Sequence, residues 1–420
     1  MRVLFTTTNW RGLYSCMLPL GWALQAAGHE VRFACAPPQT TTISHAGLTP
    51  VAVLEPLGVV ELERLARYAA AVRQPDQFTD DVPLLHPITG EPVTDVADYD
   101  VATNEPVFRR ESQEILDRNF DAAVRLARAW RPSLVIHDLM SPEGVLAAQV
   151  TGVPSAYHSL GMFGAAEASL YDPTNAAARY GVTLERSLIG YVIDPTPSMI
   201  MPAHGDALRL PIRYLTYNGP GEMPLWVLER PSRPRVTLLW SRGTANIFGT
   251  AVPTLRHAID AAVALGAEVV VTAPPAQADA LGAMPEHVRV LREFPLHMLL
   301  PTSDAIIHQG SGNPMMSGAA AGLPQLMLAM TDDGVEMGRR FARAGSALVL
   351  SGLNATADEV RAGTAELFGS PRLREAAKKI QADMAANPTA ADLVAPLERL
   401  AGTGRLTAAD LADALAVRSA

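Results

Sequence analysis

Short apolar runs alternate with longer amphipathic stretches along most of this chain. The first run, Arg2–Thr8, is followed by helical spacing of apolar residues over Leu13–Ala27. Within that helix Pro19 is expected at a kink or in an early turn, and Gly28 is expected to end it. A second strand is predicted at Val31–Ala34. Such a β-α-β unit predicts a parallel sheet with a right-handed crossover.

The same rhythm returns with strands at Leu134–His137 and Ser155–His158. A Pro- and Asp-rich stretch, Gln74–Asp98, is expected to form a long loop or lid. Proline is dense again from Pro195 to Pro234, and the end of that stretch is interpreted as an interdomain linker. Six further strands are predicted after it: Val236–Trp240, Glu268–Thr272, Val288–Leu291, Ala305–His308, Gln325–Leu328 and Ala347–Leu350.

This pattern predicts an α/β protein with two doubly wound domains in tandem. The expected division is an N-terminal domain over 1–210, a linker over 211–234 and a C-terminal domain over 235–386. A helical tail over 387–420 is expected to pack back on the first domain. Ligands of such sheets bind at the carboxyl ends of the strands.

Composition narrows the classes of function. The 420 residues carry 34 basic and 43 acidic side chains, a net charge of −9, so nucleic acid and anionic membranes are not expected partners. The only lysines are Lys378 and Lys379; with many Ala, Gly and Pro residues, this points to a high-GC bacterial genome. Two cysteines, Cys16 and Cys35, provide neither a disulfide framework nor a zinc site. Without a signal peptide or membrane-length apolar run, a soluble cytoplasmic protein is expected.

The most informative stretch lies between two predicted strands of the second domain. The strand ends at His308, and the loop Gly310-Ser311-Gly312 leads into a helix expected to begin near Asn313 or Pro314. Free N–H groups at a helix N-terminus attract phosphate, and His308 would add another donor. A tight strand-helix turn with no ligand is the alternative for this loop taken alone.

Four segments carry a wider resemblance: MLPLGWALQAAGHEVRFA at 17–34, YNGPGEMPLWV at 217–227, PLHMLLPTSDAIIHQGSG at 295–312 and AAAGLPQLMLA at 319–329. In these the chain resembles the bacterial antibiotic-type glycosyltransferases of the GT-B fold, over nearly its whole length. The resemblance implies two Rossmann-like domains facing a cleft and an inverting transfer from a dTDP- or UDP-sugar. It implies no metal and no other cofactor.

The resemblance also implies roles for residues. Phe294 and Leu296 would border the nucleobase, and Asp333, with Gly334 after it, would face the sugar. The remaining expected donor-binding residues are Ser241, Gly243, Thr244, His308, Gly310, Ser311, Gly312 and Asn313. The acceptor would meet Trp10, Leu13, Tyr14, His158, Phe163 and the Gln74–Asp98 loop. A helix N-terminal acid favoured by the helix dipole is the structural alternative for Asp333.

Several positions depart from the family pattern. Gln309 stands for a second histidine, Ser311 and Asn313 stand for glycines, and Pro314 stands for a hydroxyl residue. Proline offers neither N–H nor O–H, so at least one phosphate contact would be lost. Gly334 replaces a glutamine, a change that relatives handling deoxysugars commonly share.

The usual catalytic histidine is also missing. It lies six residues before the proline of the family's Pro-Leu pair, which is position 13 here, and Leu13 cannot take a proton. Asp138 and His158, at the ends of predicted strands, are the candidate bases. Alternatively, Asp138 caps the following turn and His158 is structural. A carbon nucleophile or an acidic phenol would need less help from a base.

The leading hypothesis is therefore a metal-independent, inverting glycosyltransferase that moves a deoxysugar to a polyketide or other aromatic natural product, by O- or C-glycosylation. A homodimer is left open, and the composition agrees with an actinobacterial biosynthetic enzyme. The alternative is a glycosyltransferase-like protein that has lost sugar transfer and acts as an auxiliary protein or catalyses another reaction. An NAD-dependent enzyme has little support, since the loop Thr6–Trp10 has no glycine fingerprint.

Overall fold

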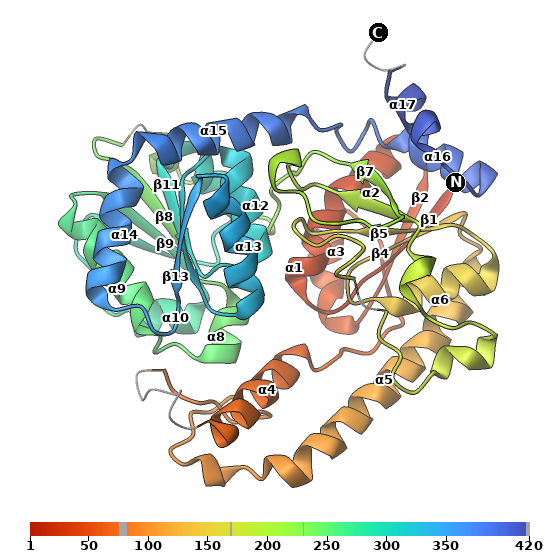
Figure 1. Ribbon diagram of the computed structural model, residues 1–420, viewed down its shortest axis with the longest axis horizontal. Coiled ribbons are helices and arrows are strands. Elements are labelled where there is room, and N and C mark those ends of the chain that lie inside the picture. Colours follow the sequence, from red (N-terminus) through yellow and green to blue (C-terminus); the bar gives the residue numbers. More distant parts are fainter. Residues whose placement is uncertain (75–81, 169, 230, 417–420) are drawn as a thin grey trace. The chain divides into compact units, whose positions relative to one another are not determined.

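The computed structural model describes residues 1–74, 82–168, 170–229 and 231–416. These residues form two separate sheets in which all paired strands run parallel (Figure 1). The first has the order β3-β2-β1-β4-β5-β6-β7 and the second the order β10-β9-β8-β11-β12-β13. In both, the order reverses direction beside the first strand, which is the doubly wound arrangement.

The first sheet begins with the predicted β-α-β unit. Its strands are β1 (Arg2–Thr6), β2 (Glu30–Cys35), β3 (Pro50–Ala52), β4 (Leu134–His137), β5 (Ser155–His158), β6 (Tyr191–Asp194) and β7 (Leu208–Pro211). The main helices up to the linker are α1 (Arg11–Tyr14), α2 (Leu18–Ala26), α3 (Thr40–His45), α4 (Val59–Arg73), α5 (Val101–Trp130) and α6 (Pro142–Thr151). Pro19 lies in the first turn of α2, where its missing N–H costs nothing.

The second sheet follows the short helix α7 (Leu225–Leu228). Its strands are β8 (Arg235–Leu239), β9 (Glu268–Ala273), β10 (Val288–Arg292), β11 (Ala305–His308), β12 (Gln325–Ala329) and β13 (Ala347–Ser351). Its helices are α8 (Arg242–Phe248), α9 (Pro253–Ala264), α10 (Pro275–Ala280), α11 (Leu296–Leu299), α12 (Gly312–Ala321), α13 (Asp332–Arg343), α14 (Ala357–Gly369) and α15 (Pro371–Ala386). Helices α9 and α14 lie side by side on one face of this sheet (Figure 1).

The sequence predicted all six strands of the second sheet to within one residue at each end. It missed three strands of the first sheet: β3, β6 and β7. β3 has three residues, and β7 lies inside the proline-dense stretch and ends at Pro211. Proline is tolerated there because β7 is an edge strand with a neighbour on one side only.

Apolar side chains cover both faces of the first sheet. Val3 and Phe5 pack toward α2, whereas Leu4 and Val135 pack toward α5 and α6. The C-terminal helices α16 (Val394–Thr403) and α17 (Ala408–Ala416) add Leu397, Leu400 and Leu411 to the α2 side of this core.

The chain divides into two compact units that do not follow the sequence order. The first comprises Met1–Leu57, Arg109–Pro220 and Asp383–Ala420, and the second comprises Gly58–Phe108 and Gly221–Ala382. Helix α4 thus belongs with the second sheet, where Arg64 Nε donates to Asn246 O of α8 over 2.5 Å. The expected domain of residues 1–210 placed this segment with the first sheet instead. Of the expected Gln74–Asp98 loop, residues 75–81 lie outside the described part of the chain.

The packing of α16 predicts a stability effect. Leu397 is fully buried, so Leu397→Ala is expected to cost about 3 kcal/mol of the first unit's free energy of unfolding, through lost transfer energy and a cavity. Chemical unfolding measures this. The control is Leu265→Ala, whose side chain is 46% exposed and which is expected to cost under about 0.5 kcal/mol. Equal effects of the two variants would contradict the docking of α16 on the core.

Candidate active site

Polar loops follow the carboxyl ends of neighbouring strands in both units. In the first unit β1, β4, β5 and β6 are consecutive neighbours, so Trp10, Asp138 and His158 emerge at one edge. In the second unit, β8, β11 and β12 are neighbours and place Ser241, the loop after His308 and Asp333 at one edge. Each edge contains the point where strand order reverses, the usual ligand position in such sheets.

Asp138 joins the loops on the two sides of the reversal point in the first sheet. Its Oδ2 accepts from Thr8 N over 2.7 Å and from Thr8 Oγ1 over 2.9 Å, and its Oδ1 accepts from Met140 N over 2.9 Å. The side chain is buried, and burial raises its pKa to about 6 against the opposing effect of these hydrogen bonds. At neutral pH Asp138 is therefore largely ionised, and its carboxylate already binds the loops that carry Thr8 and Met140. The bond from Met140 N agrees with the alternative role expected from the sequence, in which Asp138 caps the turn that follows it.

His158 lies on the α2 side of the first sheet. Its Nδ1 is 2.9 Å from Ser159 O and 4.0 Å from Cys16 Sγ, while its Nε2 is buried and has no hydrogen-bond partner. Donation to the carbonyl places the proton on Nδ1 and leaves a lone pair on Nε2. Burial lowers the pKa of His158 to about 4, so the ring is neutral at pH 7. His158 Nε2 is therefore placed to accept a proton, but it is buried inside the protein.

The other expected acceptor residues divide into exposed and buried ones. Trp10 and Phe163 are partly exposed and pack against the rim of the α2-side core. Leu13 is 6% and Tyr14 3% exposed, so their side chains belong to the core itself. Cys16 Sγ donates to Leu13 O over 3.2 Å, which connects the replaced catalytic position to the surroundings of His158.

A second buried carboxyl lies beside Asp138. Glu143, in the first turn of α6, accepts from Ser141 Oγ over 2.7 Å. Burial raises its pKa to about 7, and the charge of Asp138 adds to the shift. Glu143 holds a proton through part of the neutral range, a property that the sequence alone did not indicate.

His308 organises the glycine loop of the second unit. Gln325 Nε2 donates to Met315 O over 3.0 Å, so its Oε1 faces His308 Nε2 as an acceptor at 2.9 Å. The proton of His308 is therefore on Nε2, and Nδ1 accepts from Gly310 N over 3.1 Å. Both nitrogens are used within the protein and the ring is fully buried, with its pKa lowered by burial to about 4. The direct phosphate donor expected at His308 is in this structure a neutral ring that shapes the loop.

Helix α12 begins at Gly312, one or two residues earlier than predicted. Its N-cap is Ser311, and Pro314 occupies the third helical position, inside the first turn where N–H groups have no intrahelical acceptor. Two residues that are expected from the sequence to differ from the family contact each other here: Gln309 Nε2 donates to Ser311 Oγ over 2.9 Å. The N–H groups of the helix start remain suited to an anion.

The helix start that carries Asp333 packs closely against the glycine loop. Asp333 is exposed in the first turn of α13, and the N-cap Thr331 accepts from Gly334 N over 3.2 Å. A Cβ at position 334 would lie 2.7 Å from Gly310 O. Gly334 therefore lets the helix approach the glycine loop, and a side chain there would displace one of the two.

The remaining donor candidates lie at the same edge. Ser241 is the N-cap of α8, where its Oγ accepts from Thr244 N over 3.2 Å, and Gly243 lies in the same first turn. Phe294 is partly buried, and its carbonyl accepts from Thr272 Oγ1 over 3.0 Å. Leu296 is fully buried in a core cluster with Leu300 and Ile306, so its side chain does not reach the surface.

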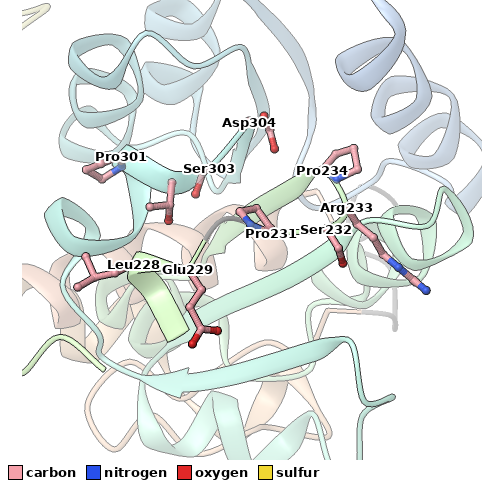
Figure 2. Close-up of a pocket in the computed structure, with 10 residues that line it drawn as sticks. Leu228, Glu229, Pro231, Ser232, Arg233, Pro234, Pro301, Ser303 and Asp304 are labelled. Atoms are coloured by element: carbon pink, nitrogen blue, oxygen red, sulfur yellow. The ribbon is translucent and has the colours of Figure 1, made fainter. Parts of the chain in front are cut away.

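No group of three or more His, Cys, Asp or Glu side chains suited to a metal ion occurs in the described ranges. No helix among the described residues is long and apolar enough to cross a membrane. A pocket of about 520 Å³ opens at the other end of the second sheet, where Pro234 and Asp304 precede β8 and β11 (Figure 2). None of its lining residues is a candidate of the sequence analysis.

Comparison with known proteins places this geometry in a family. The N-terminal domain of the erythromycin biosynthesis protein CIII-like family matches residues 22–240, and its C-terminal domain matches residues 256–400. The chain belongs to this family. It is 31% identical over 435 residues to the tylactone mycaminosyltransferase of Streptomyces fradiae, covering 96% of this chain and 93% of that protein. It is equally identical over 436 residues to the aclacinomycin-T 2-deoxy-L-fucose transferase of Streptomyces galilaeus, covering 96% and 97%.

A solved structure shares the architecture of these family members. The glycosyltransferase VinC in complex with dTDP is 28% identical and matches with a TM-score of 0.70, over 96% of this chain and all of that one. The fold is GT-B and the chain is a glycosyltransferase, which confirms the expectation from the sequence motifs.

Sequence reasoning missed the partners that hold the candidates in place. Thr8 bonds Asp138 and Gln325 bonds His308, each from another strand or loop, and no local spacing connects the two members of either pair. Asp194 of β6 likewise bonds Arg209 of β7. The one usable signal was polarity in buried strands: Gln325 opens an apolar strand, and Asp194 ends one.

The glycine loop predicts a contrast between two glycines. Gly310 has φ of +76°, and a Cβ would lie 2.9 Å from Ala329 Cα; Gly266 has φ of +75° with open space around it. Both Gly→Ala variants are expected to lose about 1–2 kcal/mol to left-handed strain. Gly310→Ala is expected to lose more because of the collision, as thermal unfolding would show. Equal losses would contradict the close approach.

The buried carboxyl of Glu143 predicts a pH dependence. Its ordinary pKa of 4.5 applies when the chain is unfolded, and the folded value is about 7. Between these values the folded state binds more protons, so stability falls as pH rises, by up to about 3 kcal/mol, and levels off above pH 7. Glu143→Gln is expected to flatten this slope in unfolding temperatures measured from pH 4.5 to 8. Exposed Glu286→Gln is the control, and an unchanged slope in Glu143→Gln would refute the assignment.

Proposed function

We propose that this glycosyltransferase moves a deoxysugar from a dTDP-type donor to a polyketide or other aromatic natural-product acceptor. The attacking oxygen or carbon forms a bond to the anomeric carbon while the bond to the nucleoside diphosphate breaks, and the configuration inverts. The observation that carries the proposal is the anion-suited loop after β11, in a chain whose relatives are named for transferring deoxysugars. No metal is required in this proposal, so EDTA leaves the rate unchanged.

The second unit supplies the donor half. The N–H groups of the N-cap Ser311 and of Gly312, the first residue of α12, would receive the diphosphate, and His308 would act as a positioning residue that fixes Gly310. Ser241, Gly243 and Thr244 lie one strand away, Phe294 borders the nucleobase, and Asp333 accepts from sugar hydroxyls. Asn313 would add a polar side chain to the helix start. Leu296 would contribute by its backbone, because its side chain is buried.

The first unit supplies the acceptor half, with Trp10 and Phe163 as its partly exposed aromatic rim. His158 Nε2 and Asp138 are the candidate bases. Both are buried, Asp138 already accepts three hydrogen bonds, and the pKa of His158 is about 4. A weak base suffices when the nucleophile is acidic, so this arrangement favours phenolic oxygen or an activated ring carbon as the acceptor atom.

Nucleotide binding tests the proposal against loss of sugar transfer. We expect millimolar dTDP to raise the unfolding temperature and to give a calorimetric heat, whereas GDP at equal concentration gives a smaller effect. Absence of dTDP binding would overturn the transferase proposal in favour of an auxiliary protein.

The replaced catalytic position offers a second test. Leu13→His is expected to raise O-transfer to a phenolic acceptor at least about tenfold by supplying a general base, and Leu13→Gln, of similar size and polarity, is expected not to. Product formation by mass spectrometry with a dTDP-deoxysugar donor measures both. Equal rates in the two variants would show that position 13 does not reach the reacting atoms.

Two further expectations complete the proposal. A cytoplasmic location follows from the expected use of a nucleotide sugar, and cell fractionation tests it. The sequence leaves a homodimer open, and sedimentation of the purified chain tests for it.

A further inference from the structure

A buried carboxylate at the end of β6 has no part in the chemistry described above. Asp194 is fully buried. Its Oδ2 is 3.0 Å from Arg209 Nε and 3.2 Å from His204 Nε2, and its Oδ1 accepts from Thr196 N over 2.9 Å. Hydrogen bonds from His204 and Thr196, with the charge of Arg209, outweigh burial and hold the pKa of Asp194 below its ordinary value. The group is a fixed anion that orders the loop after β6.

The hydroxyl of Thr196 connects the loop after β6 to a second loop. Thr196 Oγ1 donates to Asp194 Oδ1 over 2.5 Å, which directs its lone pairs away from the carboxylate. Thr196 Oγ1 also accepts a hydrogen bond from Met162 N over 2.8 Å. Met162 belongs to the loop that follows His158 of β5, so one hydroxyl joins the two neighbouring loops.

The loop that receives this bond has an unfavourable backbone. Met162 has φ of +72° and Gly161 has φ of +100°. A residue with a Cβ seldom adopts the left-handed region unless its surroundings enforce it. The turn also places Ser159 Oγ between Gly161 N, from which it accepts over 3.0 Å, and Phe163 O, to which it donates over 2.7 Å. The conformation at Met162 therefore sets where Phe163 lies and what Ser159 can bond.

A second contact holds the same two loops together. Ala166 N donates to Ala203 O over 3.3 Å, and Gly164 packs so closely on Ala203 O that a Cβ would collide with it. His204, which binds Asp194, is the next residue. The loop after β5 thus contacts both Thr196 and the residue beside His204, the two side chains that bind the carboxylate.

We propose that Asp194 and Thr196 are positioning residues for the acceptor. They hold the loop Ser159–Ala168 so that Phe163 forms the acceptor wall and the Ser159 carbonyl keeps the proton of His158 on Nδ1. The proposal rests on the proposed function, since it assigns Phe163 and His158 to the acceptor half. It adds that the acceptor wall is set by two buried side chains on a neighbouring strand and its loop, neither of which touches the acceptor.

Substitutions at Thr196 separate the hydroxyl from the bulk of the side chain. Thr196→Val keeps the shape and removes the hydroxyl; Thr196→Ser keeps the hydroxyl. With alizarin as a phenolic probe, we expect Thr196→Val to raise the acceptor Kd and KM about tenfold, the loss of one hydrogen bond, with dTDP affinity unchanged. Thr196→Ser is expected to remain within about twofold of the unchanged protein. Asp194→Asn is expected to exceed the effect of Thr196→Val.

Hydrogen exchange tests the loop without turnover. The amides of Gly161, Met162 and Phe163 are expected to exchange at least about tenfold faster in Thr196→Val and to be restored in Thr196→Ser. The matched control is Thr364→Val in the second unit, whose buried hydroxyl donates to Val360 O of its own helix over 2.7 Å. That variant should lose stability without changing alizarin binding or loop exchange.

The outcomes distinguish the positioning role of Asp194 and Thr196 from the proposed transferase function. Unchanged exchange and unchanged alizarin affinity in Thr196→Val would overturn the positioning role while leaving the transferase function intact. A uniform loss of dTDP and alizarin binding in Thr196→Val would show a general structural role and would also overturn it. If the unchanged protein bound dTDP but no alizarin, the phenolic acceptor would be wrong, and exchange at Met162 alone would decide the positioning role.

Discussion

Parallel pairing of every strand is the constraint on which the candidate residues of each unit depend. It brings the carboxyl ends of all strands in a sheet to one edge, so polar residues from distant parts of the chain meet there. The same constraint buries them, because both faces of a parallel sheet are covered by helices. Most buried polar groups then need a partner within the protein. Thr8 for Asp138, Gln325 for His308 and Thr196 for Asp194 answer that requirement.

Burial also decides which protonation states are available for chemistry. Removing water disfavours charge, so the pKa of Asp138 rises to about 6 and that of His158 falls to about 4. Neither group is a strong, exposed base of the kind that would deprotonate an unactivated alcohol. An acceptor that ionises readily, or attacks through carbon, suits such a site better.

Residues in and beside the glycine loop contact one another. Gln309 bonds Ser311, and Gly334 makes room for the carbonyl of Gly310. A side chain added at position 334 would collide with that carbonyl. A change at one of these positions would therefore disturb its neighbour.

Local sequence was sufficient for the strands of the second sheet, the glycine loop and the family, because apolar periodicity and contiguous motifs carry them. It also located Asp138, His158 and Asp333, since polar residues that directly follow apolar strands are visible in the sequence. Only the tertiary structure decided what those residues can do. The tautomer of His308 depends on Gln325, and the ionisation of Glu143 depends on the burial of the first turn of α6. The grouping of α4 with the second sheet depends on contacts with α8. These properties come from contacts between residues far apart in the chain, and hydrophobic periodicity carries no record of them.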